Sequence, residues 1–157
     1  MCIRDRDSAR RMANDLRPAA FAHMVLQTAL TQHIQGFAAL SSLQISIREV
    51  APFPQLDEAT NLAFFRATQE ILTNIAKHAQ ATTVDIQLRS GGGRLWIEID
   101  DDGVGIDDGS MNKAGSLGLV GIHERFTALG GGLTLQKREP RGTRVAVFIP
   151  EPRPNLN

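Results

Sequence analysis

Residues 95–106, LWIEIDDDGVGI, form an alternating strand that stops in a turn built of acid and glycine. Leu95, Ile97 and Ile99 alternate with polar or aromatic residues, which predicts one buried strand face, and the same period places Asp101 on that face. A carboxylate at the edge of a core needs donors or water, and glycine permits close backbone approach. The turn is therefore a candidate site for a ligand that offers an N–H group. An acidic surface turn is the alternative, since Asp and Gly are common turn residues.

Composition indicates an ordinary single-domain protein. The chain has 157 residues, of which 42% are hydrophobic and 22% charged, enough for one domain with its own core. Its 17 basic residues balance 17 acidic ones, which gives no electrostatic case for nucleic acid or an anionic membrane. One cysteine, Cys2, provides no disulfide framework. No apolar run approaches the ~18 residues of a membrane span, so we expect a cytoplasmic chain without membrane contact.

The N-terminal part is predicted to be helical. Residues 1–20 look like the end of a preceding helical region that stops at Pro18, and residues 1–6 show no interpretable pattern. The main domain is expected over residues 21–152, with a proline-rich tail at 153–157. Apolar residues recur at steps of three and four from Ala19 to Leu40, which predicts a helix with one buried face. An alternating strand, residues 43–48, follows.

A second helix is predicted from Asp57, a good N-cap, to about Ala79. Its apolar side on a helical wheel comprises Leu62, Phe65, Leu72, Ile75, Ala76 and Ala79. A narrow stripe opposite comprises Arg66, Glu70, Asn74 and Lys77. The stripe is either a solvated face with an ion pair or, beside a strand that ends in Asp101, a site for metal-bound phosphate.

The C-terminal half reads as strands and one more helix. Strands at 83–89 and 94–100 form a hairpin across a glycine turn. Residues 107–117 are polar and glycine-rich, as in a lid loop, and residues 118–122 precede a helix whose glycine-rich start favours anions. Two strands, 133–138 and 143–149, close the domain. Alternation in the last strand points Thr143 inward, at the edge of the face that holds Asp101, where a shared ligand or water could satisfy its hydroxyl.

Four motifs together resemble the ATP-binding domain of sensor histidine kinases. Residues 70–79, EILTNIAKHA, resemble the asparagine box, in the variant of nitrate-sensor-like kinases that serve LuxR-type response regulators. Residues 101–106 resemble the first glycine box, residues 118–131 the second, and Gly142-Thr143 the closing glycine-threonine pair. Leu16-Arg17-Pro18 resembles the junction that follows the dimerisation helices.

The resemblance implies an α/β (α+β) two-layer sandwich of the Bergerat type, a mixed sheet of about five strands with about three helices on one face. It also implies ATP and Mg²⁺ as cofactors. At the adenine end, Asp101 would accept from the adenine amino group, and Thr143 would support it through water. Gly103 and Gly105 would permit close backbone approach, and Ile106 would join the nucleotide contacts.

At the phosphate end, the resemblance makes Asn74 the Mg²⁺ ligand and brings Lys77 and His78 to phosphate oxygens. Glu70 would either polarise the nucleophile or orient Asn74. The lid hinge, phosphate cradle and neighbouring nucleotide contacts would comprise Gly115, Gly118, Leu119 and Gly121.

The implied reaction is phosphoryl transfer from ATP to a histidine. Neither His23 nor His33 has the acid-flanked context of the family's phosphoacceptor, so we expect the acceptor on the parent's dimerisation domain and a LuxR-type response regulator as the next partner. The alternatives are another Bergerat-fold ATPase, an anti-sigma-type serine kinase, or a calcium-binding acidic loop. The calcium alternative is disfavoured because Val104 and Ile106 stand where oxygen ligands should be.

Overall fold

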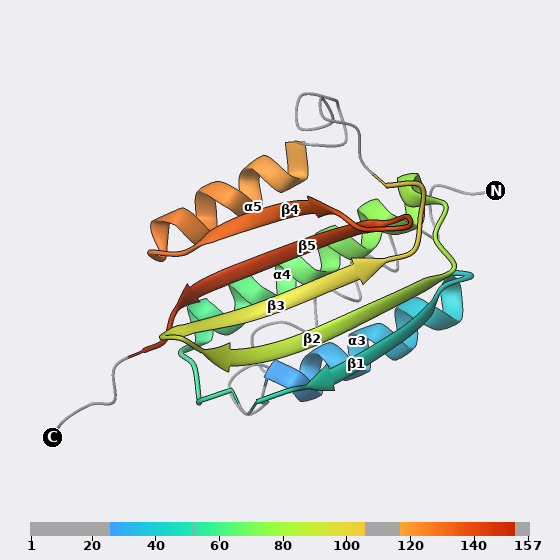
Figure 1. Ribbon diagram of the computed structural model, residues 1–157. Helices are drawn as coiled ribbons and strands as arrows, with labels where there is room; N and C mark the ends of the chain where they lie inside the picture. Colours follow the sequence, from blue (N-terminus) through green and yellow to red (C-terminus); the bar gives the residue numbers. More distant parts are fainter. Residues whose placement is uncertain (1–25, 52, 106–116, 153–157) are drawn as a thin grey trace, which may run out of the picture.

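The computed structural model describes residues 26–51, 53–105 and 117–152 (Figure 1). The helical elements are α3 (Leu26–Leu40), α4 (Glu58–Asn74), the π-helix η1 (Ile75–Ala79) and α5 (Leu117–Ala128). The strands are β1 (Gln44–Glu49), β2 (Thr83–Gly91), β3 (Arg94–Asp101), β4 (Gly132–Lys137) and β5 (Thr143–Pro150). Among the described helices, none is both long and apolar enough to cross a bilayer.

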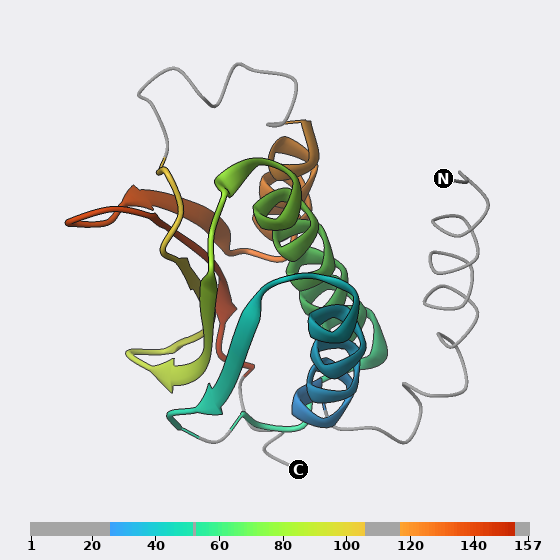
Figure 2. The ribbon, with the colours of Figure 1, turned by 90° about the vertical axis from the view of Figure 1, so that its right-hand side faces the viewer.

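The five strands form one mixed sheet in the order β1-β2-β3-β5-β4. Strands β1 and β2 pair in parallel, because the chain crosses over through α4 between them, and the other three pairings are antiparallel. Helices α3, α4 and α5 all lie on one face, as Figure 2 shows. The expected two-layer Bergerat-type sandwich is thus confirmed.

Strand β3 lies at the centre of the sheet and follows the predicted alternation. Leu95, Ile97 and Ile99 are fully buried under the helices, and Asp101 at the strand's end is only 3% exposed. Because side chains on one strand alternate between faces, Asp101 lies on the same helix-covered side as these apolar residues. The sequence-based placement of this carboxylate is confirmed.

The core between sheet and helices centres on two phenylalanines. Phe64 of α4 and Phe126 of α5 are fully buried, with ring centroids 5.2 Å apart in an edge-to-face arrangement. Such a pair contributes about 0.5–1.5 kcal/mol beyond its burial. The pair fixes α5 against α4, and it thereby also positions the second glycine box relative to the asparagine box.

Helix α4 departs from the predicted wheel near its end. Ala76, predicted on the apolar side, is exposed, because the helix changes from α to π at Ile75 and the wider turn rotates the residues that follow. The buried side is also broader than predicted, since Phe64, Ala67, Thr68 and Ile71 are buried as well. Asp57 caps the helix as expected, with its carboxylate accepting from the Thr60 backbone N–H at 2.8 Å.

Two further helix predictions need correction. Leu40, the last residue of α3, is 84% exposed rather than buried. Gly118 and Gly121 lie within the first two turns of α5 rather than before it. The predicted start of the first helix, near Ala19, lies outside the described residues.

Candidate active site

Asp101 is a buried carboxylate at the carboxyl end of β3. Its Oδ1 accepts from the Gly103 backbone N–H at 2.8 Å. Burial raises the pKa of Asp101 above its ordinary value, and the N–H groups of Gly103 and Thr143 oppose this shift by favouring the ionised form. A carboxylate held this way is a strong acceptor at the edge of an apolar layer, suited to a ligand N–H group.

Thr143 lies directly opposite Asp101 in the β3–β5 ladder and is likewise buried. The preceding Gly142 has φ +107°, and a Cβ added there would overlap the Asp101 carbonyl oxygen. Glycine is therefore required at 142 for both its backbone conformation and its close approach to β3. The pairing of Gly142-Thr143 with the acidic turn, inferred from strand parity, is observed.

The acid-glycine turn is attached to the end of η1. The Val104 backbone N–H donates to the Ala79 carbonyl at 2.8 Å, and a Cβ on Gly103 would overlap that same oxygen. Gly103 thus approaches the protein's own backbone closely, while its predicted approach to a nucleotide stays a prediction. The contact brings the turn next to the helical segment that carries Lys77 and His78, both exposed.

Asp102 has a structural role that the sequence analysis missed. Its Oδ1 accepts from the backbone N–H groups of Thr82 and Thr83 at 2.8 and 2.9 Å, tying the end of β3 to the start of β2. These bonds lower the pKa of Asp102 below its ordinary value. The two neighbouring acids therefore differ in kind: Asp102 faces backbone donors outside the core, whereas Asp101 faces the core.

Asn74 ends α4 at the point where the π-helix begins. Its Nδ2 is buried and has no hydrogen-bond partner among the described residues, an arrangement that typically costs about 1–3 kcal/mol. Helical π turns occur frequently at functional sites, and an amide oxygen is a suitable Mg²⁺ ligand. An unsatisfied amide group here fits a nucleotide, because its N–H can meet a phosphate oxygen while its oxygen meets the metal.

Glu70 lies one turn before Asn74 and contacts the first turn of α5. A Cβ on Gly118 would overlap the Glu70 Oε1, so the absence of a side chain at 118 makes room for this carboxylate. Helix α5 has no acid in its own first turn, where a negative charge is favourable. Glu70 supplies that charge from the neighbouring helix, a role that its sequence position did not suggest.

Some of the remaining predicted positions are described by the structure and others are not. Gly121 is exposed with open space around it, and Leu119 is half-buried and packs partly against the core. Gly105 has φ +83°, a conformation that favours glycine. Ile106 and Gly115 lie outside the described residues, as does most of the predicted lid. In the described ranges, no three His, Cys, Asp or Glu side chains gather as metal ligands.

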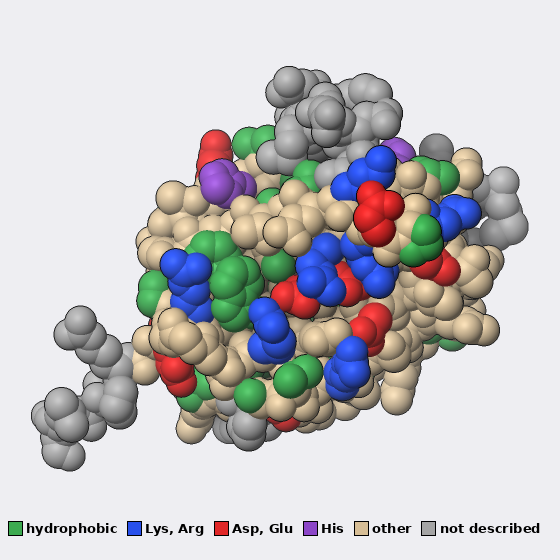
Figure 3. Space-filling view, viewed as in Figure 1, with side chains coloured by type: hydrophobic (Ala, Val, Ile, Leu, Met, Phe, Trp, Pro, Cys, Tyr) green, Lys and Arg blue, Asp and Glu red, His purple; other side chains and the backbone are tan. Residues whose placement is uncertain are grey.

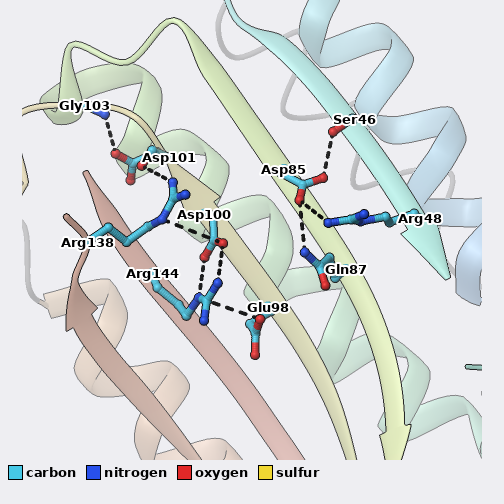
Figure 4. A network of polar contacts seen from close by, with 10 residues as sticks. All are labelled: Ser46, Arg48, Asp85, Gln87, Glu98, Asp100, Asp101, Gly103, Arg138 and Arg144. Atoms are coloured by element: carbon cyan, nitrogen blue, oxygen red, sulfur yellow. Dashed lines mark hydrogen bonds and ion pairs between the residues drawn. The ribbon is translucent and has the colours of Figure 1, made fainter. Parts of the chain in front are cut away.

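The helix-free face of the sheet carries a network of arginines and carboxylates (Figure 3). Asp100 is 6% exposed although no helix covers it, because Arg144 donates to both of its carboxylate oxygens at 2.7 Å (Figure 4). These bonds raise the pKa of Arg144. Arg138 approaches Asp100 at 3.8 Å and donates to the Asp101 carbonyl at 3.0 Å. The alternation that buries Asp101 could have located Asp100 on this face, but not its partners.

A mixed sheet with helices on one face, a buried Asp opposite a Thr, and an unsatisfied Asn on the central helix together define an ATP-binding domain of the Bergerat class. Residues 59–153, more than half of the chain, match the family described as histidine kinase-, DNA gyrase B-, and HSP90-like ATPase. The chain belongs to this family.

Several curated relatives are histidine kinases. The chain is 36% identical over 150 residues to the signal transduction histidine-protein kinase/phosphatase UhpB of Salmonella typhimurium, and 30% identical over 141 residues to DegS of Brevibacillus brevis. The oxygen sensor histidine kinase NreB of Staphylococcus carnosus is 26% identical over 144 residues. These matches cover 92%, 90% and 92% of the chain but only 28%, 36% and 42% of the respective relatives. The resemblance to the ATP-binding domain of sensor histidine kinases is confirmed.

Solved structures show the same fold. The histidine kinase domain of the blue-light activated kinase EL346 from Erythrobacter litoralis superposes with a TM-score of 0.67 at 22% identity, covering 80% of this chain and 61% of that one. The Acinetobacter baumannii histidine kinase AdeS gives a TM-score of 0.66 at 15% identity, covering 82% of this chain and 64% of that one. At these identities the comparison supports the fold alone.

Proposed function

We propose that the chain is the catalytic domain of a two-component sensor histidine kinase that transfers the γ-phosphoryl group of ATP to a histidine on a dimerisation domain. One observation supports this proposal more strongly than the other observations do. Asp101 and Thr143 form a polar pair at the rim of an apolar layer, and the Gly103–Ala79 contact joins this pair to the helical segment bearing Asn74. The proposed acceptor for the base is therefore joined by direct contacts to the helical segment that carries the proposed phosphate ligands.

The adenine end provides base selection. In this proposal the Asp101 carboxylate accepts from the adenine amino group, with Thr143 holding a water against both. Guanine has a carbonyl oxygen in the corresponding position, and two acceptors facing each other repel. The burial of Asp101 strengthens this discrimination, because a buried polar group left unpaired costs more than an exposed one.

The phosphate end provides charge neutralisation. Asn74 is the residue suited to hold Mg²⁺, which when bound would screen the phosphate oxygens. Lys77 and His78 lie exposed on η1, where they would meet the phosphates, and Gly121 in the first turns of α5 has open space around it. Glu70 orients the Asn74 region against α5. The acceptor histidine nitrogen forms a bond to the γ-phosphorus as the bond between that phosphorus and the ADP oxygen breaks, and the proton lost by the imidazole passes to water.

The partners follow from the same proposal. The acceptor histidine resides on the dimerisation domain of the parent kinase, and a LuxR-type response regulator receives the phosphoryl group afterwards. The similarity to UhpB, DegS and NreB supports the kinase assignment. We place the reaction in the cytoplasm, where ATP is available.

Mixing the chain with γ-labelled ATP, Mg²⁺ and candidate dimerisation domains tests this function. We expect label on the dimerisation domain that is labile in acid and stable in base, as phosphohistidine is, and none when the acceptor histidine is replaced by glutamine. Asp101→Asn in this chain provides a second control, which should reduce the label because it weakens ATP binding. Acid-stable label on a serine would favour the anti-sigma-type kinase, and ADP release without label transfer would favour a simple ATPase.

A further inference from the structure

Two arginines from the β4–β5 turn, residues 138–142, bind the backbone of the acid-glycine turn. The Arg138 Nη1 donates to the Asp101 carbonyl at 3.0 Å, and the Arg141 Nε donates to the Gly103 carbonyl at 3.1 Å. We propose that Arg138 and Arg141 are positioning residues for adenine recognition, which hold the Asp101 carboxylate in its binding orientation. This inference rests on the proposed function of Asp101.

The geometry fixes both ends of the segment that orients the carboxylate. Asp101 Oδ1 accepts from the Gly103 N–H, so its direction depends on the peptide planes between residues 101 and 103. Arg138 holds the carbonyl at the start of this segment and Arg141 the carbonyl at its end. With both held, the segment has little freedom to rotate, and the carboxylate stays pre-organised before any ligand arrives.

Arg138 is itself held in place. Its backbone N–H donates to the Gly142 carbonyl at 3.0 Å, and its Nε lies 3.8 Å from the Asp100 Oδ2. Asp100 in turn is fixed by Arg144 (Figure 4). The Arg138 guanidinium therefore lies against the acid-glycine turn and belongs to a network anchored in β3 and β5, rather than being a free surface side chain.

The Arg138 charge adds an electrostatic effect to the positioning. Burial raises the pKa of Asp101, and the positive charge of Arg138 opposes this rise, whereas the neighbouring Asp102 adds to it. Other charged or titratable groups near the turn are Arg141 on the β4–β5 turn, the Asp100–Arg144 pair on β3 and β5, and Lys77 and His78 on η1. Adenosine is the suitable probe, because it lacks the phosphates that the η1 side chains are proposed to meet.

Arg48 offers a matched control on the same sheet face. It pairs with Asp85 at 3.1 Å on strands β1 and β2, and no bond links it to the described part of the acid-glycine turn, residues 101–105 (Figure 4). Replacing Arg48 removes the same charge and the same kind of ion pair from the same surface. Any difference between Arg138 and Arg48 variants therefore reports on the contact with the turn.

The test measures adenosine binding by ligand-observed NMR for the unchanged chain and for Arg138→Gln, Arg138→Lys, Arg141→Gln and Arg48→Gln, from neutral pH down to the lowest pH at which each protein stays folded. We expect Arg138→Gln to bind about tenfold more weakly and to lose affinity at a higher pH than the unchanged chain. Arg138→Lys keeps the charge, so its acid limb should stay in place while affinity falls severalfold. Arg141→Gln should weaken binding, and Arg48→Gln should change neither quantity.

Melting temperatures separate positioning from unfolding. Each variant is compared at a temperature where it is folded, and Arg138→Lys carries the test if Arg138→Gln is too unstable. Unchanged affinity and acid limb in Arg138→Gln, or equal effects in the Arg138 and Arg48 variants, would overturn the inference while leaving the function of Asp101 intact. Failure of the unchanged chain to bind adenosine or ATP would overturn both.

Discussion

Asp101→Asn should weaken ATP binding without lowering the stability of the free chain. The change keeps the volume of a side chain that is 3% exposed, and the asparagine Oδ1 can still accept from the Gly103 N–H. What changes is the other end of the group, where an acceptor oxygen becomes an N–H donor. In the proposed complex that donor faces the adenine amino group, which is also a donor.

The magnitude follows from the burial of the site. Two donors facing each other away from water cost about 1–3 kcal/mol, so ATP affinity should fall by about fivefold to 150-fold. The stability of the free chain should instead rise or stay level. Burial raises the pKa of Asp101, which means that the folded state disfavours the ionised carboxylate relative to the unfolded state. An asparagine carries no such penalty.

The pH dependence of this stability difference has a definite sign. Above the folded-state pKa the penalty on ionised Asp101 is fully present, so Asp101→Asn should have its largest advantage near neutral pH. As pH falls through the raised pKa the advantage should shrink, and below the ordinary value of 3.8, where the carboxyl is protonated in both states, it should vanish. Thermal melting at several pH values measures this difference.

Calorimetric titration with ATP and with GTP, each with Mg²⁺, measures the binding side. We expect the unchanged chain to prefer ATP strongly, and Asp101→Asn to lose most of that preference. Equal ATP affinity in the two proteins would refute the adenine assignment. A large loss of melting temperature at neutral pH would refute the argument from burial, because it would show that the folded state favours the ionised group.

Three further changes test other parts of the structure. Asn74→Ala should abolish the additional ATP affinity that Mg²⁺ confers while leaving metal-free adenosine binding nearly intact. It should also raise the melting temperature slightly, because it removes a buried unpartnered amide. A variant that keeps Mg²⁺-dependent ATP binding would exclude Asn74 from the site. Asp57→Ala should cost about 1 kcal/mol in denaturant unfolding through loss of the α4 N-cap. Because hydrogen bonds to Thr60 lower the pKa of Asp57, this contribution is present above the ordinary value of 3.8 and is lost as pH falls through the folded-state pKa, so a constant difference down to low pH would argue against the cap. Gly142→Ala should lower both the melting temperature and adenosine affinity, since φ is +107° and the new methyl group would overlap the Asp101 carbonyl; unaltered values of both would contradict that close approach.

Local pattern alone determined much of this fold. The alternation of Leu95, Ile97 and Ile99 placed Asp101 on the covered face, and the same period on β5 placed Thr143 there. Asp57 marked the start of α4, and the glycine turn marked the β2–β3 hairpin. These features are predictable because strand alternation, helix capping and tight turns depend on residues only a few positions apart.

The site's internal contacts were decided by tertiary structure alone. Arg138 lies 37 positions from Asp101 in the sequence and Arg144 lies 44 positions from Asp100, and these pairs meet only once β5 has paired with β3 in a particular register. The approach of Gly103 to Ala79 and of Glu70 to Gly118 likewise requires the helices to be packed on the sheet. Such contacts have no sequence period, because they depend on how separately formed elements dock. The π turn that exposes Ala76 belongs with them, since nothing in the local sequence pattern of α4 distinguished a π turn from continued α-helix.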